Sequence, residues 1–205
     1  MATKKSKTDT ATATAITLPA MQIERMQLTL VGDSPLICHA WSEKAKRAML
    51  DRQMKKAKQA RETRDPEADY WSSLYVIKDH PERDVTKMRF GFPAVAFKSA
   101  AVDACSHVQG ITKVEARGAF HIDGDMVQIN GVPTPREDMV RVMNSADIRF
   151  RGEFREWSAR LTILYNASVL SAEQIAHLFT LGGFAIGAGE WRPQKDGSFG
   201  RFHVG

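Results

Sequence analysis

The sequence predicts an α+β fold, in which strands and helices are mingled without a regular βαβ repeat. Three observations support this prediction. Apolar and polar residues alternate, as is typical of strands, at residues 26–31 and 158–165. Apolar residues recur at spacings of three and four, as is typical of helices, within residues 42–64, 92–110 and 171–181. Near the C-terminus, six glycines fall within nineteen residues, which indicates backbone with positive φ or a close backbone approach.

The first strand, residues 26–31, ends at a Gly-Asp-Ser-Pro turn. A long helix over residues 42–64 follows, with Ser42 as its N-cap, and Asp65-Pro66 ends it. One half of its helical wheel is apolar and holds Ala45, Met49, Leu50, Met54, Ala57 and Ala60. The other half is basic, interrupted by Asp51, and holds Lys44, Arg47, Arg52, Lys55, Lys56 and Lys58. This basic face is either a solvated helix surface or a contact for nucleic acid.

A short helix is predicted over residues 67–75, and the charged segment 78–87 is predicted to be an exposed loop. The next helix opens at Phe92-Pro93, and Gly110 ends it. Short strands at residues 119–122 and 126–129 flank Asp-Gly-Asp, which predicts a β-hairpin.

Residues 131–157 contain two prolines and many arginines, and we expect them to be irregular or partly extended. After the strand at 158–165, a helix begins at Ser171 and runs to about residue 181. A glycine-rich stretch and a last strand at 199–204 close the chain. This order of elements fits a four-stranded antiparallel sheet backed by two helices, the ferredoxin-like (RRM-type) arrangement, with a helical insertion at about residues 40–90.

Size and composition limit the domain organisation and the class of protein. The chain has 205 residues, 43% of them hydrophobic, enough for one well-packed domain, which we place at residues 21–205. Residues 1–20 are rich in Thr, Ala and Lys and are predicted to form a disordered basic tail. Two cysteines, Cys38 and Cys105, exclude a disulfide framework and a four-cysteine zinc site. We therefore expect a cytoplasmic protein, in a bacterial cell or a phage-infected host, with no membrane span.

The net charge gives weak support for a polyanionic partner. Of the total of +5, the tail carries +2, from three lysines and one aspartate, which leaves +3 for the rest of the chain. No nucleotide-hydrolysing P-loop motif is present, and Gly187-Ala188-Gly189 lacks the third glycine of a dinucleotide fingerprint. Asp123 and Asp125 have no partners at metal-ligand spacing. We therefore expect no cofactor and no metal.

The C-terminal segment combines glycines with basic and aromatic residues. Arg192, Lys195 and Arg201 could contact phosphates, while Trp191 and Phe199 could stack on bases, the usual combination for single strands. The glycines at 182, 183, 187, 189, 197 and 200 could bring peptide N–H groups close to a phosphate. The alternative is a set of tight turns without a ligand, and Gly182-Gly183 could be a helix C-cap.

This segment resembles the C-terminal signature of the RAMP superfamily, in which Leu-Gly-Gly ends a helix and Gly-x-Gly and Gly-x-Phe-Gly lead into a last strand. The resemblance covers about 35 residues closely. As a compact, tailed, single-module version, the chain also looks like the small proteins carried by phages and prophages. It implies a ferredoxin-like, RRM-like fold of the kind found in CRISPR-type RNA-binding proteins. In that family the glycine-rich loop lies against RNA, and the matching residues here are Gly182, Gly183, Gly187, Gly189, Gly197 and Gly200.

We infer that the chain binds single-stranded RNA or DNA without catalysis and assembles along the strand as an oligomer. The expected ligands are the C-terminal residues above, extended by Lys44, Arg47, Lys55 and Lys58 on the basic helix and by Arg149 and Arg151, which could share one face of a strand. One alternative, implied by the resemblance, is a metal-independent endoribonuclease that uses His39 as general acid or base. A lone histidine beside an apolar run is also typical of a packed or capping residue. The other alternative is a phage structural or decoy protein that interacts with a CRISPR-type complex.

Overall fold

The computed structural model describes residues 20–56, 63–142 and 145–205. The predicted tail, apart from its last residue, and Lys58, Ala57 and Ala60 of the basic helix lie outside these ranges. None of the helices in the described parts of the chain is long and apolar enough to cross a membrane.

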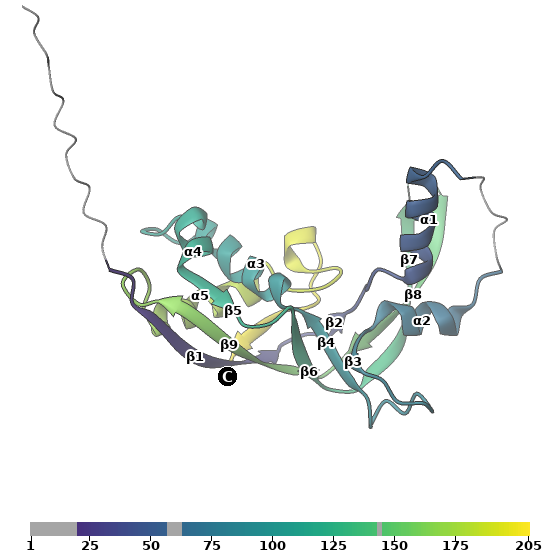
Figure 1. Cartoon of the computed structure of the whole chain (residues 1–205), viewed down its shortest axis with the longest axis horizontal. Helices are drawn as coiled ribbons and strands as arrows, with labels where there is room; N and C mark the ends of the chain where they lie inside the picture. The colour runs from purple at the N-terminus through teal and green to yellow at the C-terminus, as the bar shows by residue number, and fades with distance from the viewer. Residues whose placement is uncertain (1–19, 57–62, 143–144) are drawn as a thin grey trace, which may run out of the picture.

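A seven-stranded antiparallel sheet forms the centre of the molecule (Figure 1). Six strands follow one another across it, in the order β10 (Phe202–Val204), β1 (Ile23–Gly32), β9 (Ser158–Asn166), β6 (Met126–Asn130), β4 (Arg89–Pro93) and β3 (Tyr75–Lys78). The seventh strand, β5 (Phe120–Ile122), also pairs with β9. Helices α3 (Ala94–Ala104), α4 (Lys113–Ala119) and α5 (Ala172–Ala185) lie over one face of this sheet (Figure 1). We call the sheet and these three helices the body.

The predicted fold class is confirmed. Strands β10, β1, β9 and the β5–β6 segment stand in the order expected of a ferredoxin-like sheet, and α3 and α5 cover its apolar face. Alternate residues of β1 and β9 point into this core, where Leu30, Leu161 and Ile163 are fully buried. The helices α4 and α5 begin with capping boxes at Thr112 and Ser171. Cys38 and Cys105 are buried, as the composition suggested, and burial raises the pKa of the Cys38 thiol to about 12.

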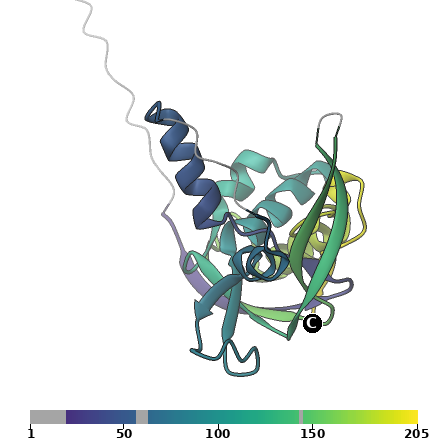
Figure 2. The same cartoon turned by 90° about the vertical axis from the view of Figure 1, so that its right-hand side faces the viewer.

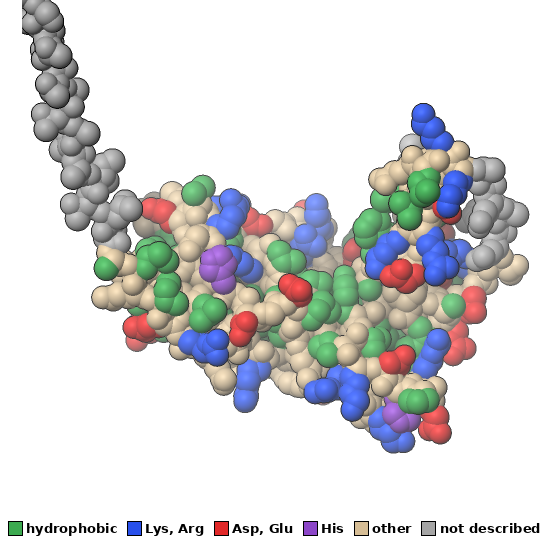
Figure 3. Space-filling model, viewed as in Figure 1, with side chains coloured by type: hydrophobic (Ala, Val, Ile, Leu, Met, Phe, Trp, Pro, Cys, Tyr) green, Lys and Arg blue, Asp and Glu red, His purple; other side chains and the backbone are tan. Residues whose placement is uncertain are grey.

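A second group of elements projects from one end of the body, and we call it the arm. It holds β2 (Leu36–Ile37), α1 (Glu43–Gln53), α2 (Pro66–Ser73), β7 (Pro133–Val142) and β8 (Ser145–Phe154). Strands β2, β8 and β7 form a separate three-stranded sheet. Helix α2 is tied to this sheet because the Ser73 hydroxyl accepts a hydrogen bond from Gly152 N, at 2.7 Å. Figures 1 and 2 show the arm and the body from two sides, and the space-filling view in Figure 3 shows a hollow between them.

Two predictions about strands differ from the structure. Residues 131–157 were expected to be irregular or partly extended, and the structure shows a regular hairpin, in which β7 and β8 pair over ten residues from Pro133↔Phe154 to Val142↔Ser145. Asp123-Gly124-Asp125 does not turn a hairpin, because β5 pairs with β9, whereas β6 pairs mainly with β4. Strands β5 and β6 both pair antiparallel with β9, so the Asp-Gly-Asp segment interrupts one long strand, and β6 also pairs with β4 along its other edge. The choice of partner is a long-range effect that local turn residues do not encode.

The basic helix is shorter than predicted. Ser42 is its N-cap, as expected, but α1 ends at Gln53, and Lys55 has a positive φ of 55°. None of its residues is buried, so its apolar side chains do not pack on the core. Helix α4 was not predicted, although Thr112 and Glu115 form a capping box at its start.

Candidate functional site

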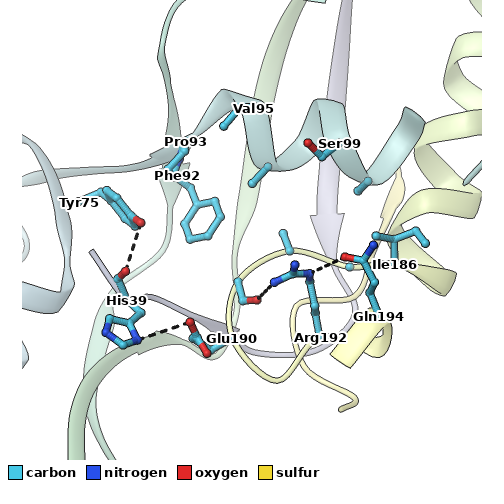
Figure 4. A pocket seen from close by; sticks show the side chains of 15 residues that line it. His39, Tyr75, Phe92, Pro93, Val95, Ser99, Ile186, Glu190, Arg192 and Gln194 are labelled. Carbon is cyan, nitrogen blue, oxygen red and sulfur yellow. Dashed lines mark hydrogen bonds and ion pairs between the residues drawn. The ribbon is translucent and has the colours of Figure 1, made fainter. Parts of the chain in front are cut away.

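An open cleft lies on the hollow side of the molecule, between α3 and the C-terminal loop, residues 186–201. Its volume is ≈ 320 Å³. Figure 4 shows that α3 supplies one wall, with Val95 and Ser99, and that the loop supplies the opposite wall, with Glu190 and Arg192. The other labelled side chains that line it are His39, Tyr75, Phe92, Pro93, Ile186 and Gln194.

Glycine lets the C-terminal loop fold closely on itself and on strand β2. Gly200 has φ +66°, and a Cβ atom there would collide with the carbonyl oxygen of Ala188. The amide of Glu190 donates to the Ile37 carbonyl at 3.1 Å, which fixes the loop to β2. Gly187, Gly189 and Gly197 also contact protein atoms too closely for a side chain. The close approach that the glycine pattern predicted is therefore made to the protein's own chain.

Gly182 and Gly183 belong to helix α5, which continues to Ala185, so their predicted place in the loop is wrong. A Cβ on Gly182 would come within 2.5 Å of the Ala100 carbonyl oxygen in α3. A Cβ on Gly183 would collide with the Phe202 carbonyl oxygen in β10. The missing side chains let α5 pack tightly against both neighbours.

Arg192 is held in the cleft wall by a chain of hydrogen bonds. Its Nη1 donates to the Gly189 carbonyl at 3.0 Å, and its Nε donates to Gln194 Oε1 at 3.2 Å. Gln194 Nε2 in turn donates to Asp103 Oδ2 at 3.0 Å, and Lys113 pairs with the same carboxylate at 2.8 Å. Both hydrogen-bond partners of Arg192 are neutral, and a guanidinium has five N–H donors. Three donors therefore remain for a ligand.

His39 and Glu190 form a pair at the end of the cleft nearest the arm (Figure 4). His39 Nδ1 lies 3.5 Å from Glu190 Oε1 and 3.2 Å from Arg151 Nη2. The hydrogen bond with His39 and the charges of Arg151 and Arg192 hold the pKa of the Glu190 carboxyl below its usual range. The two side chains are 43% and 42% exposed, so both can meet a ligand.

Arg151 was predicted to contact nucleic acid, but the structure places it inside an ion-pair network between the arm and the loop. Its side chain is 6% exposed, and Nη1 pairs with Asp138 Oδ2 at 3.2 Å. Asp138 also accepts from Arg136 at 2.8 Å, and Arg136 pairs with Glu153 at 2.9 Å. Arg151 is therefore occupied by protein carboxylates. Arg149, the other predicted contact on this strand, is 39% exposed and pairs with Asp147 at 2.9 Å.

The aromatic candidates differ in their surroundings. The Arg136 guanidinium lies 4.6 Å from the centroid of the Phe199 ring, a cation–π contact that covers one face of the ring. Trp191 is 39% exposed and has a positive φ of 53°. It is therefore the more accessible of the two rings.

The basic candidates lie on two sides of the hollow. Lys195 is exposed in the loop, and Arg201 is half-buried, with its Nε donating to the Ser198 carbonyl. Lys44 and Arg47 are exposed on α1, and Lys55 is exposed just after its end. Figure 2 shows α1 well separated from the C-terminal loop, and Figure 3 shows the hollowed surface between the body and the arm. The structure thus places the two basic groups apart, with the cleft between them.

Sequence reasoning did not find several cleft residues. Tyr75, Phe92 and Ser99 come from the end of the insertion and from α3, and Glu190 was passed over within the glycine-rich stretch. A lone acid among glycines, followed by Trp and Arg, was the one available signal. Within residues 20–56, 63–142 and 145–205, no three His, Cys, Asp or Glu side chains come together in a way that could hold a metal ion.

Comparison with solved structures shows the fold. The chain is similar to a chain in the cryo-EM structure of Type III-B Cmr-beta bound to cognate target RNA, with a TM-score of 0.50 and 11% identity. The match covers 89% of this chain, which spans 59% of the length of that chain. The crystal structure of Cmr6 from Pyrococcus furiosus matches with a TM-score of 0.46 and 8% identity, over 91% of this chain and 100% of that one. No family model and no curated protein matches the sequence. At 11% identity, this likeness shows the fold alone.

Proposed function

We propose that this protein binds single-stranded RNA along the hollow between the body and the arm. The observation that carries the proposal is the cleft itself, because the glycine-rich loop that the sequence singled out forms one of its walls. A groove that combines aromatic rings with basic groups suits a strand whose bases are unstacked and whose phosphates are exposed. Tyr75 and Phe92 supply rings in the cleft, and Arg192 supplies a fixed guanidinium.

The basic groups on either side would contact the phosphates that lead into and out of the cleft. Lys195 lies on the loop side, and Lys44 and Arg47 lie on α1, whose first turn follows His39 closely in the chain. The similar Cmr-beta structure contains target RNA, which favours RNA over DNA as the first ligand to test. Assembly of several copies along one strand, and a role within a CRISPR-type complex, belong to the same proposal.

Removing the three basic groups of the loop is expected to weaken binding at low salt by at least about tenfold. For single strands each lost phosphate contact changes the slope of log K against log salt by about 0.7, so the loss of Lys195 and Arg201 in the Arg192→Ala/Lys195→Ala/Arg201→Ala variant should make that slope shallower by about 1.4. Fluorescence anisotropy with labelled single-stranded RNA and DNA, at several salt concentrations, measures both quantities.

The matched control removes three exposed charges from strands of the body, in Lys78→Ala/Arg89→Ala/Arg160→Ala. Arg160 alternates with the buried Ala159 and Leu161, so it points away from the helices. This control should keep the affinity and most of the salt slope. Equal losses in the two variants would place binding outside the hollow, and no binding of either strand by the wild type at low salt would refute the proposal.

A second candidate function rests on His39 and Glu190. A histidine beside a carboxylate at the end of an RNA-sized cleft is the kind of pair that acts as general acid or base in metal-independent cleavage of RNA. Under the binding proposal, we expect RNA incubated with the protein in EDTA to remain intact on a denaturing gel. EDTA-resistant cleavage that His39→Ala abolishes and His177→Ala preserves would instead favour a ribonuclease, since His177 lies away from this cleft on α5.

A further inference from the structure

The polar side chains of the cleft differ in how many of their hydrogen-bond donors and acceptors are already used within the protein. The side-chain amide of Gln194 is engaged at both ends, with Oε1 accepting from Arg192 and Nε2 donating to Asp103. These two bonds fix the orientation of the amide and leave it one N–H and one oxygen lone pair. The two charged groups beside it, Glu190 and Arg192, keep free capacity.

Glu190 offers acceptors to the cleft. Its side chain is 42% exposed, and its nearest contacts, at 3.5 Å to His39 and 3.9 Å to Arg151, are long. An ionised carboxylate has about four lone-pair sites and can accept two parallel hydrogen bonds. Among the RNA bases, only guanine presents two adjacent N–H donors, N1–H and N2–H, on its Watson–Crick edge.

Arg192 offers donors to the same space. Hydrogen bonds to Gly189 and Gln194 fix its guanidinium plane, so little side-chain freedom remains to be lost when a ligand binds. A guanidinium fits the O6 and N7 acceptors on the other edge of guanine, the commonest specific contact of arginine with a base. Phe92, Pro93 and Val95 give an apolar surface for the flat face of the ring.

We propose that the cleft is a subsite for one unpaired guanine base, with Glu190 accepting from its Watson–Crick edge and Arg192 donating to O6 and N7. This inference rests on the proposed binding of single-stranded RNA. The cleft volume of ≈ 320 Å³ lies at the lower end of the range for small-molecule sites and suits one base rather than a stack. The rest of the strand is held through its phosphates and is read without regard to sequence.

The test compares four labelled oligouridine 12-mers that differ in one central base, G, A, C or U, by fluorescence anisotropy with the wild-type protein. The G-containing strand should bind about tenfold more tightly than the other three. Two further strands carry inosine, which lacks the N2 amino group, or 7-deazaguanine, which lacks N7. Both of these strands should bind with little or no advantage over the strands with A, C or U. Inosine removes one of the two hydrogen bonds to Glu190, and 7-deazaguanine removes one of the two hydrogen bonds to Arg192.

Glu190→Gln should abolish the preference for G, so that strands with a central G and a central U bind the variant with equal affinity. The matched control is Glu156→Gln, which removes an exposed carboxylate from the turn between β8 and β9 and should keep the preference. If Glu190→Gln does not fold, the inosine and deazaguanine strands still decide the question on the wild type.

The outcomes for the guanine subsite and for the proposed function are separate. Binding of all four strands with equal affinity would overturn the guanine subsite and leave the proposed function standing. A preference that inosine retains would overturn the role of Glu190, and failure to bind any strand would overturn both proposals.

Discussion

Replacing Asp138 with alanine is expected to lower the free energy of unfolding by about 3–5 kcal/mol, because it leaves the buried Arg151 guanidinium without its principal partner. Arg151 is 6% exposed, and its Nε already lacks a hydrogen-bond partner among the described atoms. The carboxylate of Glu190 is 3.9 Å away and cannot replace the lost contact fully. Urea denaturation followed by circular dichroism measures the change.

The control for this variant is Glu137→Ala, one position earlier on β7, where the side chain points to the exposed side of the hairpin. We expect a change of no more than about 0.5 kcal/mol there. A loss of less than about 1 kcal/mol in Asp138→Ala would contradict the prediction and would mean that water reaches the Arg151 guanidinium. The same measurement tests whether the network fixes the arm to the C-terminal loop.

Gly183→Ala is expected to lower the free energy of unfolding by about 3 kcal/mol, at the upper end of the range for overpacking. The new Cβ would collide with the backbone carbonyl oxygen of Phe202, which cannot move aside as a flexible side chain could. This effect should exceed the gain of about 1 kcal/mol that alanine brings to a helix. Thermal and urea unfolding both measure it.

Gly118→Ala is the matched control, because Gly118 is also in a helix, α4, and a Cβ there meets nothing within 4 Å. We expect that variant to be more stable than the wild type, by up to about 1 kcal/mol. Equal behaviour of the two variants would mean that α5 can shift away from β10 at little cost.

The strands and helices that sequence reasoning predicted correctly are those whose pattern is local. Strand β9 alternates polar and apolar residues from Ser158 to Ile163, and α5 begins at a capping box formed by Ser171 and Gln174. These elements, taken in order, were sufficient to predict a ferredoxin-like sheet with two covering helices.

The hairpin β7–β8 was missed because its pattern is charged where a strand is usually apolar. Arg136, Asp138, Arg151 and Glu153 are all partly or fully buried, and two of their ion pairs, Arg136 with Glu153 and Arg151 with Asp138, join the two strands. On its own, β7 shows two prolines, and both strands show arginines and acids, which are typical of a loop. Only the pairing of β7 with β8 makes these residues a buried face.

The candidate site divides in the same way. The glycine-rich loop and its Arg192 were recognised from composition, because a dense run of glycines requires unusual backbone wherever it lies. The position of Gly182 and Gly183 inside helix α5 was not predicted. Only the close approach of α3 and β10 explains why a side chain cannot be accommodated at these two positions. Arg151 was predicted to bind phosphate. In the structure its guanidinium faces the carboxylates of Asp138 on β7 and Glu190 in the loop, which are distant from it in the sequence.

The sequence by itself determined the fold class, the position of the central strands and helices, and the presence of a tightly folded glycine-rich loop, because each depends on residues close together in the chain. Only the tertiary structure decided which charged groups face the hollow and which are neutralised, since ion pairs such as Arg151 with Asp138 and Glu190 join distant segments. It also assembled the cleft, whose walls come from His39, β3, β4, α3 and the C-terminal loop. Local patterns do not encode these contacts, because they arise only when the sheet and the arm have formed.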